Sequence, residues 1–352
     1  MIPKSLKIRY TSPMLLSLRS SFDVITVGAA TQDIFLRSPH LEETPNADAP
    51  DGLNVCIPFG AKINIEEMHI TSGGGATNAA VTFARYGLKT ACLCRIGNDQ
   101  IGANIIDELR REKVSSRFVQ KDRAHKTACS VILLSGGGHR AILTHRGASS
   151  HLSSTQIPWS SLRTRWIYLT SVAGDLDLVK QVFKFARTQK INIAWNPGQA
   201  ELNHGLRKLS PLFKQTKILL LNREESALVS ELPARHLRAI FQKLGRLPET
   251  ATIITDGQKG AYAYHKDKKV YLFAPILSAD RINSTGAGDA FGSGCISAFI
   301  KGTKLDEALQ VGTLNATGVI SHMGAKTGIL HHLPTERERK IVHIKQLSPS
   351  AL

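Results

Sequence analysis

The middle of the chain alternates short apolar runs with longer stretches in which apolar and polar positions follow a helical period. The apolar runs have lengths that suit buried strands, and they fall at residues 166–169, 191–195, 218–221 and 252–255. Residues 176–187 and 236–244 have the apolar spacing of amphipathic helices. Strands that alternate with helices in this way predict right-handed crossovers and a doubly wound, mostly parallel α/β sheet.

The first part of the chain predicts a second, smaller sheet. Residues 23–28 form an apolar run that we expect to be a buried strand, and Gly28 ends it in a loop that carries Thr31 and Asp33. Residues 37–53 predict a surface loop and residues 99–113 a helix, and shorter strands are expected at 54–57, 61–66, 90–97, 128–134 and 140–144. The last two flank a glycine-rich loop and predict a hairpin. We expect residues 34–70 and 117–145 to form a lid beside the main sheet.

Polar side chains follow three of the strands predicted in the middle of the chain. In chain order they are Asn196, then Asn222 with Glu225, and then Thr255 with Gly257 and Gly260. Because ligands of open parallel sheets bind beyond the carboxyl ends of the strands, we expect these residues to face one cleft. Asp33 follows the first strand and would be placed there to hold sugar hydroxyl groups, with a structural turn cap as the alternative.

The stretch from Asn283 to Asp289 combines two glycines, an alanine and an acid at the expected start of a helix. Such a turn gathers backbone N–H groups of Gly286, Ala287 and Gly288 at the positive end of the helix, which favours a bound anion. Asp289 beside an anion site suggests a base that takes a proton from a hydroxyl group while the turn holds a phosphoryl group. A glycine-rich structural cap is the alternative from these residues alone.

A second glycine run, from Gly73 to Gly75, opens another expected helix that continues through residue 86. Three glycines allow the backbone to approach a ligand closely, and the amide of Asn78 can donate to and accept from a hydroxyl group. A purely structural loop is the alternative here. The later glycine motif does not fit the dinucleotide-binding fingerprint, because its third glycine, Gly292, lies one position too late, and this argues against a dehydrogenase.

The length, net charge and cysteine content of the chain limit its fold, its partners and its cellular compartment. With 352 residues and 42% hydrophobic side chains, the chain can bury a full α/β core, as one large domain with a small appendage or as two domains. Five scattered cysteines suit a reducing compartment, so we expect a cytoplasmic protein. The net charge of +17 would attract phosphorylated ligands, but the basic residues are dispersed, so no specific nucleic-acid partner is expected. No apolar run has the length of a membrane span.

The two ends of the chain carry little recognisable chemistry. Residues 1–21 are basic and lack acids, which predicts a disordered basic arm, with a transit peptide as the alternative. Residues 331–352 are polar and predict a C-terminal tail. Residues 22–330 hold all the motifs described above, and we expect them to form the functional domain.

With these motifs assembled, residues 22–330 resemble the ribokinase-type carbohydrate kinases, the PfkB family. The amino-terminal signature of that family is matched from residues 73–78 through Gly87 to Gly97. The carboxy-terminal signature is matched over residues 283–294 and departs at Cys295. Two signatures in this order, about two hundred residues apart, are more specific than a single glycine motif. The resemblance implies a ribokinase-like α/β fold with a small β-sheet lid, and ATP-dependent phosphorylation of a hydroxyl group on a small sugar.

The resemblance also implies a role for each motif. Asp289 would be the catalytic base, and the amides of Gly286, Ala287 and Gly288 would bind the γ-phosphoryl group. Asn222 and Glu225 would organise Mg²⁺, through water, around the triphosphate of ATP. Nucleotide contacts would come from Thr255, Gly257, Gly260 and Asn315, and sugar contacts from Thr31, Asp33, Gly74, Gly75 and Asn78. These parts suffice because phosphoryl transfer needs positioning and charge neutralisation, and the lid would exclude water.

Two positions depart from the pattern of the family. Asn283 stands where many relatives carry an Asp that helps to bind a monovalent cation, so activation by potassium is left open. Thr31 stands where true ribokinases usually carry Asn, which leaves the identity of the sugar open.

Two alternative functions follow from the same residues. One is a nucleoside kinase of the adenosine-kinase type, in which lid residues such as Ile57 and Phe59 would cover a base. The other is a non-catalytic sugar or nucleotide sensor, against which the intact Asp289 and Gly286 argue. In either case we expect the exposed face of the lid to pair two copies of the chain in a homodimer.

Overall fold

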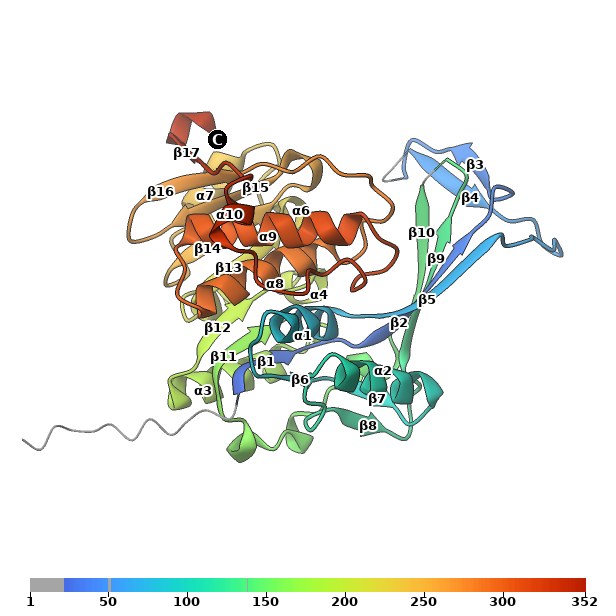
Figure 1. Cartoon of the computed structure of the whole chain (residues 1–352), viewed down its shortest axis with the longest axis horizontal. Helices are drawn as coiled ribbons and strands as arrows, with labels where there is room; N and C mark the ends of the chain where they lie inside the picture. Colours follow the sequence, from blue (N-terminus) through green and yellow to red (C-terminus); the bar gives the residue numbers. More distant parts are fainter. Residues whose placement is uncertain (1–21, 50–51, 138) are drawn as a thin grey trace, which may run out of the picture.

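The computed structural model describes residues 22–49, 52–137 and 139–352, and within them the largest element is a nine-stranded sheet (Figure 1). Its strands run parallel from β6 to β14, and β15, β16 and β17 continue it in antiparallel pairs. The doubly wound, mostly parallel α/β sheet predicted from the sequence is therefore confirmed. In sheet order the strands are β17 (Lys345–Leu347), β16 (Val270–Ala274), β15 (Ala261–His265), β14 (Ala251–Thr255), β13 (Ile218–Asn222), β12 (Asn192–Trp195), β11 (Thr164–Leu169), β1 (Phe22–Val27) and β6 (Thr90–Leu93).

Helices cover both faces of this sheet, and each face has its own hydrophobic core. Trp195 and other strand residues pack on one face against helices α3 to α7, whereas Tyr168 and Leu220 pack on the other against α1, α8 and α9. Because successive strand residues point to opposite faces, strands buried on both sides appear in the sequence as continuous apolar runs. The helices are α1 (Gly75–Arg85), α2 (Gln100–Arg111), α3 (Leu176–Gln189), α4 (Gln199–Leu202), α5 (Leu206–Phe213), α6 (Arg223–Ser230), α7 (Leu237–Leu244), α8 (Ala287–Ile300), α9 (Leu305–Ile320) and α10 (Glu336–Arg339).

A smaller sheet extends from one end of the main domain (Figure 1). At its centre β2 pairs antiparallel with β5 and parallel with β9, and β9 forms the predicted hairpin with β10. In sheet order this small sheet consists of β10 (Arg140–His145), β9 (Ala128–Leu134), β2 (Thr31–Arg37) and β5 (Glu67–Gly73). Two further strand pairs lie outside it, β3 (Glu42–Pro45) with β4 (Leu53–Cys56) and β7 (Arg95–Gly97) with β8 (Gln120–Asp122).

Several expected strand boundaries were wrong. In each case the strand that pairs with the segment sets the limits of the observed strand. Thr31 and Asp33 lie on β2 and not in a loop, since β2 continues the chain after β1 into the small sheet. Residues 61–66 form no strand; the strand is β5, which finds its hydrogen bonds on β2. The expected strand at 90–97 divides into β6 in the main sheet and β7, which pairs with β8. Residues 120–122 therefore lie outside the small sheet.

The ends of the chain also differ from the simplest expectation. Residues 1–21, expected to form a basic arm, lie outside the described residues. The C-terminal residues hold α10 and β17, and β17 pairs with β16 at the edge of the main sheet. Strands β15 to β17 were not predicted; they pair antiparallel in succession, outside the strand–helix alternation that predicted the parallel strands. In the described part of the chain, we find no helix long and apolar enough to cross a bilayer.

Helices α8 and α9 pack unusually closely because glycines line their contact. A Cβ atom at Gly312 would collide with Cys295 Sγ and would lie 2.7 Å from the carbonyl oxygen of Phe291. A Cβ atom at Gly294 would meet its nearest neighbours, Asn315 Cβ and Gly312 Cα, at 3.2 Å. The close contact fixes α8, which carries the glycine motif and Asp289 at its start.

We expect Gly312→Ala to lower the free energy of unfolding by about 1–3 kcal/mol, because the backbone of α8 must move away from the new methyl group. Gly294→Ala is the graded comparison, since a few tenths of an ångström relieve its contact and alanine gains about 1 kcal/mol of helix propensity over glycine. Urea unfolding of both variants measures the difference. Equal stability of the two variants would contradict the packing described for Gly312.

Candidate active site

A glycine turn, residues 283–288, leads into α8. Gly286 is the N-cap of the helix and has a φ angle of 81°, a left-handed conformation that favours glycine. A Cβ atom at Gly286 would lie 2.8 Å from Ala325 Cα, so the turn packs tightly on the loop after α9. Asn283 Oδ1 accepts the N–H of Thr285 at 3.0 Å, which fixes the start of the turn. The first N–H groups of α8 therefore form a rigid site that favours an anion.

Asn283 itself is buried beneath this turn. Its Nδ2 atom has no hydrogen-bond partner among the described residues, while its Oδ1 atom is engaged by Thr285. A neutral amide in this position offers no carboxylate to a cation. At residue 283 the glycine turn is therefore held by a neutral amide and not by a charged side chain.

Asp289 lies in the first turn of α8, beside the glycine turn. Its Oδ2 atom accepts a hydrogen bond of 2.8 Å from Asn78 Nδ2, which comes from α1. Burial raises the pKa of Asp289 above its usual value, and the hydrogen bond from Asn78 and the charge of Lys326 oppose that rise. Asp289 is therefore a hydrogen-bonded carboxylate beside the glycine turn, with a pKa above its usual value.

Asp33 approaches the same point from the small sheet. It lies on β2 between Thr71 of β5 and Ser130 of β9, and it is 5% exposed. Burial raises its pKa to about 6, the hydrogen bond from Ser130 and the charge of Lys326 oppose the rise, and the charge of Asp289 adds to it. The negative charge of Asp289 thus acts on a buried carboxylate that the small sheet supplies.

Glycines bring the backbone close to Asp33. A Cβ atom at Gly73 would collide with the Asp33 carboxylate, and one at Gly74, where φ is 96°, would lie 2.6 Å from the carbonyl oxygen of Ala29. Gly75 is the first residue of α1. Thr31, half-buried on β2, is paired in register with Gly73. The structure thus brings together the residues that the sequence predicted for sugar binding.

Asn222 and Glu225 form a capping box at the start of α6. The N–H of Asn222 donates to Glu225 Oε2 at 2.8 Å, and the N–H of Glu225 donates to Asn222 Oδ1 at 2.7 Å. Both residues line a cavity of about 240 Å³ that also reaches Gly286, Gly288 and Asp289. Burial raises the pKa of Glu225 to about 7, and the charge of Asp289 raises it further, against the hydrogen bond from Asn222.

This cavity fits a hydrated divalent cation better than a fully coordinated one. The charge of Asp289 raises the pKa of Glu225, and a cation near Glu225 would relieve this repulsion. Within the described residues no cluster of three or more His, Cys, Asp or Glu side chains could hold a metal ion. Asn222 Oδ1 is already engaged in the capping box. Glu225 is therefore the side chain that would hold Mg²⁺, with water and phosphate as the remaining ligands.

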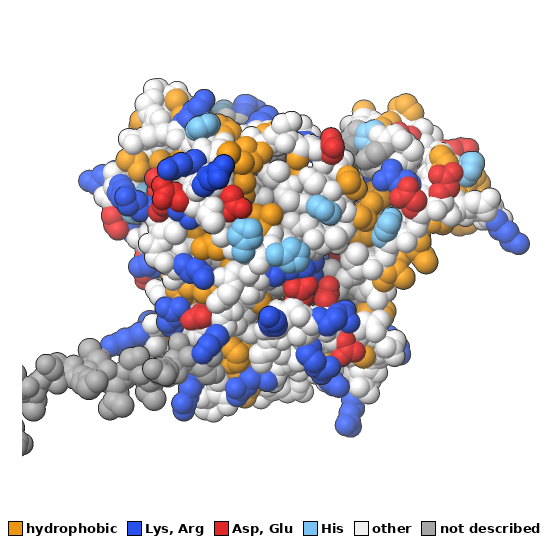
Figure 2. All heavy atoms as spheres, in the orientation of Figure 1, with side chains coloured by type: hydrophobic (Ala, Val, Ile, Leu, Met, Phe, Trp, Pro, Cys, Tyr) orange, Lys and Arg blue, Asp and Glu red, His pale blue; other side chains and the backbone are white. Residues whose placement is uncertain are grey.

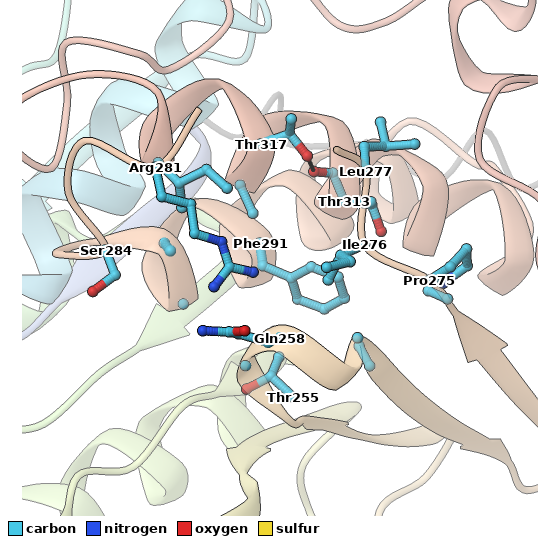
Figure 3. Close-up of a pocket in the computed structure, with 18 of the residues that line it drawn as sticks. Thr255, Gln258, Pro275, Ile276, Leu277, Arg281, Ser284, Phe291, Thr313 and Thr317 are labelled. Atoms are coloured by element: carbon cyan, nitrogen blue, oxygen red, sulfur yellow. Dashed lines mark hydrogen bonds between the residues drawn. The ribbon is translucent and has the colours of Figure 1, made fainter. Parts of the chain in front are cut away.

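A larger pocket of about 540 Å³ adjoins the glycine turn (Figure 3). Thr255, Gly257 and Gly260, expected to contact nucleotide phosphates, all line it. Gly260 has a φ angle of 94°, and a Cβ atom there would collide with the carbonyl oxygen of Ala274, so glycine is required. The pocket is also lined by residues that the sequence analysis did not identify, which include Gln258, Pro275, Ile276, Leu277, Arg281, Phe291, Thr313, Ala316, Thr317 and Ile320.

Asn315, which the family resemblance predicts to contact the nucleotide, does not line this pocket. It is completely buried, and its amide nitrogen donates to the carbonyl oxygen of Ala290 at 2.8 Å while its oxygen accepts the N–H of Leu330 at 3.1 Å. Its side chain thus joins α9 to α8 and to the chain after the helix. Thr313, Ala316 and Thr317 of the same helix line the pocket.

Two cations near the site had no signal in the sequence. Arg140 of β10 donates to Ser284 Oγ at 2.7 Å and to Thr285 Oγ1 at 3.3 Å, which joins the small sheet to the glycine turn. Lys326 is 5% exposed, and its ammonium group contacts Ser72 and lies 3.3 Å from Glu108 Oε2. Each contact spans more than a hundred residues of sequence, so no local spacing could reveal it.

Known proteins resemble this chain over most of its length. A family model described as "pfkB family carbohydrate kinase" matches residues 50–332. Ribokinase from Haemophilus influenzae is 26% identical over 293 residues, 81% of this chain and 92% of that protein. Nucleoside kinase from Methanocaldococcus jannaschii is 24% identical over 258 residues, 73% of this chain and 82% of that protein.

A solved structure shares the architecture as well. Ribokinase from Arabidopsis thaliana, complexed with ribose and ATP, matches with a TM-score of 0.71 and 20% sequence identity, over 91% of this chain and 98% of that chain. At this level of identity the likeness establishes the ribokinase-like fold.

The raised pKa of Glu225 predicts a pH-dependent contribution to stability. Because its folded pKa of about 7 exceeds the usual value of 4.5, the buried carboxyl group stabilises the fold fully below about pH 4.5 and loses this effect as the pH rises through 7. We expect the stability of the ligand-free protein relative to Glu225→Gln to fall by about 1–3 kcal/mol over this window. Urea unfolding of both proteins at several pH values measures it, and a difference that does not change with pH would contradict it.

Proposed function

Since this chain belongs to the pfkB family of carbohydrate kinases, and so is a phosphotransferase with an alcohol acceptor, we propose that it transfers the γ-phosphoryl group of ATP to a hydroxyl group of a small sugar. The observation that carries the proposal is the position of Asp289. It lies at the N-terminal end of α8, is hydrogen-bonded to Asn78, lines the cavity that also holds Glu225, and its charge acts on Asp33. A single carboxylate thus borders an anion site and a polar acceptor site.

The reaction follows from these positions. The acceptor hydroxyl is held by Asp33 and Asn78, and its proton passes to the carboxylate of Asp289 as the new O–P bond forms. The bond between the γ-phosphorus and the bridging oxygen breaks, and ADP leaves with that oxygen. N–H groups of Gly286, Ala287 and Gly288 stabilise the charge on the transferring group. Mg²⁺, when bound near Glu225, would neutralise the phosphates, and Glu225 would hold it through water.

The small sheet would act as a lid over this centre. Its strand β2 carries Asp33 at the root, and Arg140 of β10 already binds Ser284 and Thr285 of the glycine turn. A cation anchored there would also meet the incoming phosphoryl group and couple closure of the lid to phosphate binding. Exclusion of water by the lid would protect ATP from hydrolysis.

A sugar is favoured over a nucleoside as acceptor. Asp33 and Asn78 offer a carboxylate and an amide, which suit several hydroxyl groups. Phe59 and Ile57, which would cover a base, are exposed side chains in this conformation, and Phe59 is fully so. A nucleoside kinase from Methanocaldococcus jannaschii is nevertheless among the relatives, so nucleosides belong in the assay.

Coupled ADP release with Mg-ATP tests the reaction across ribose, fructose, other hexoses, adenosine, inosine and cytidine. We expect a sugar-dependent signal that Asp289→Asn lowers by about 10²–10⁴-fold, because the base is removed while its hydrogen bond to Asn78 can remain. Asp306→Asn is the matched control, an exposed acid in the first turn of α9 that lines neither cavity of the site. A nucleoside-only signal would overturn the substrate class. ATP binding without any acceptor-dependent turnover would instead support a sensor.

We further propose that a second copy of this chain covers the outer face of the small sheet. The register places Leu143, Val131, Ile34 and Ile70 side by side on one face. Leu143 is 61% exposed and Ile70 is 56% exposed, and Figure 2 shows hydrophobic side chains gathered on this part of the molecule. An apolar sheet face of this kind is typical of an interface between like subunits.

Leu143→Glu should shift the protein from dimer to monomer in sedimentation velocity at micromolar concentration, because two buried charges would face each other across the interface. Ile142→Glu is the matched control, since Ile142 is the next residue on the same strand, is 49% exposed, and points to the other face. A native chain that sediments as a monomer, or a dimer that survives Leu143→Glu, would contradict the proposed interface.

A further inference from the structure

The pocket of about 540 Å³ has two chemically different ends. One end is apolar and is lined by Pro275, Ile276 and Leu277, while the other is the glycine turn with Ser284. In Figure 3 these ends lie on opposite sides of Phe291. If the base of the nucleotide occupies the apolar end and its terminal phosphate the glycine turn, its α- and β-phosphates cross the middle of the pocket. Negative charge of the ligand therefore accumulates between Ser284 and Phe291.

Arg281 brings a positive charge to this middle section. It lies in the loop between β16 and α8, is exposed, and is the only Lys or Arg among the described residues that line the pocket. Figure 3 shows its guanidinium group directed into the pocket, between Ser284 and Phe291 and toward the amide of Gln258 on the opposite wall. Within the described residues no hydrogen bond or ion pair holds the guanidinium group, so its donors remain available to a ligand.

We propose that Arg281 binds the α- and β-phosphates of the nucleotide donor, with the Gln258 amide opposite, and thereby selects phosphorylated nucleotides. A guanidinium ion presents paired N–H donors that match two phosphate oxygens and stays charged at any physiological pH. The inference rests on the proposed function, because it assumes that this pocket takes the donor. It deepens that function by assigning the donor specificity to a side chain outside both glycine motifs.

Arg140 supports this assignment from the other side of the glycine turn. Its hydrogen bond to Ser284 Oγ places a second guanidinium group beside a residue that lines the pocket. Arg281 and Arg140 would then flank the phosphate chain, one from the nucleotide pocket and one from the small sheet. The two arginines have separate roles, since Arg281 lines the pocket and Arg140 does not.

The test uses the full-length chain and a fluorescent ADP analogue, whose affinity is first measured by direct titration for each variant. Displacement of the analogue by ADP and by adenosine then compares a ligand with phosphates and one without them in the same pocket. The variants are Arg281→Gln, Arg281→Lys and the matched control Lys259→Gln. Lys259 is an exposed cation in the short helix Gly257–Lys259, adjacent to the pocket but not lining it.

We expect Arg281→Gln to weaken ADP binding by about 10-fold to 100-fold, the effect of losing a charge-assisted hydrogen bond, and to change adenosine binding by less than about twofold. Arg281→Lys should fall between the native protein and Arg281→Gln, and Lys259→Gln should change neither ligand. In steady-state assays the KM for ATP should rise in Arg281→Gln, with kcat at saturating ATP changed by less than about threefold.

Three outcomes would overturn the inference. Equal weakening of ADP and adenosine would mean that Arg281 acts on the base or on the shape of the pocket. Unchanged ADP affinity in Arg281→Gln, with native protein that binds ADP, would overturn the role of Arg281 and leave the proposed function standing. A native protein that binds neither ADP nor adenosine would overturn the assignment of the donor pocket itself.

Discussion

The hydrogen bond from Asn78 to Asp289 joins the two segments on which the site depends. Asn78 belongs to α1 and Asp289 to α8, and the two helices lie on the same face of the main sheet, packed through one core. α1 begins at the glycine run beside the small sheet, and α8 begins at the glycine turn. A bond of 2.8 Å therefore fixes the start of α1, where we propose that the acceptor binds, relative to the glycine turn. The close packing of α8 against α9 holds α8, and with it Asp289, in position.

Charge is the second constraint on this centre. Asp33, Asp289 and Glu225 are all carboxylates whose pKa values are raised, chiefly by burial, and each of the other two is affected by the charge of Asp289. Lys326 opposes the rise for Asp33 and Asp289, but it is itself engaged with Glu108 and Ser72. Strongly shifted pKa values of this kind are common at sites that bind charged ligands. A bound cation and the hydroxyl groups of an acceptor would lower the cost of charging these carboxylates. Arg140 at the glycine turn and Arg281 in the larger pocket would instead bind an anion.

The small sheet links these requirements to the rest of the molecule. Its central strand carries Asp33 toward the site, and its hairpin reaches the glycine turn through Arg140. Its outer face exposes Ile70 and Leu143, so the strands that position a binding residue also present an apolar surface. Movement of this sheet would change the surroundings of Asp33 and of the glycine turn together, because both are attached to it.

The sequence determined those features that arise within a few residues of the backbone. The alternation of strands and helices and the glycine-rich start of α8 were both predicted from the sequence, and the chain folds in that way. The left-handed conformation of Gly286 and the capping box of Asn222 and Glu225 likewise arise from local sterics and short spacings. Only the tertiary structure decided which distant side chains meet. It buried Asn315 in the contact of two helices, directed Arg281 into the larger pocket, and brought Arg140 to Ser284. These contacts depend on strand order and register, which join residues far apart in the chain and leave no periodic trace in it.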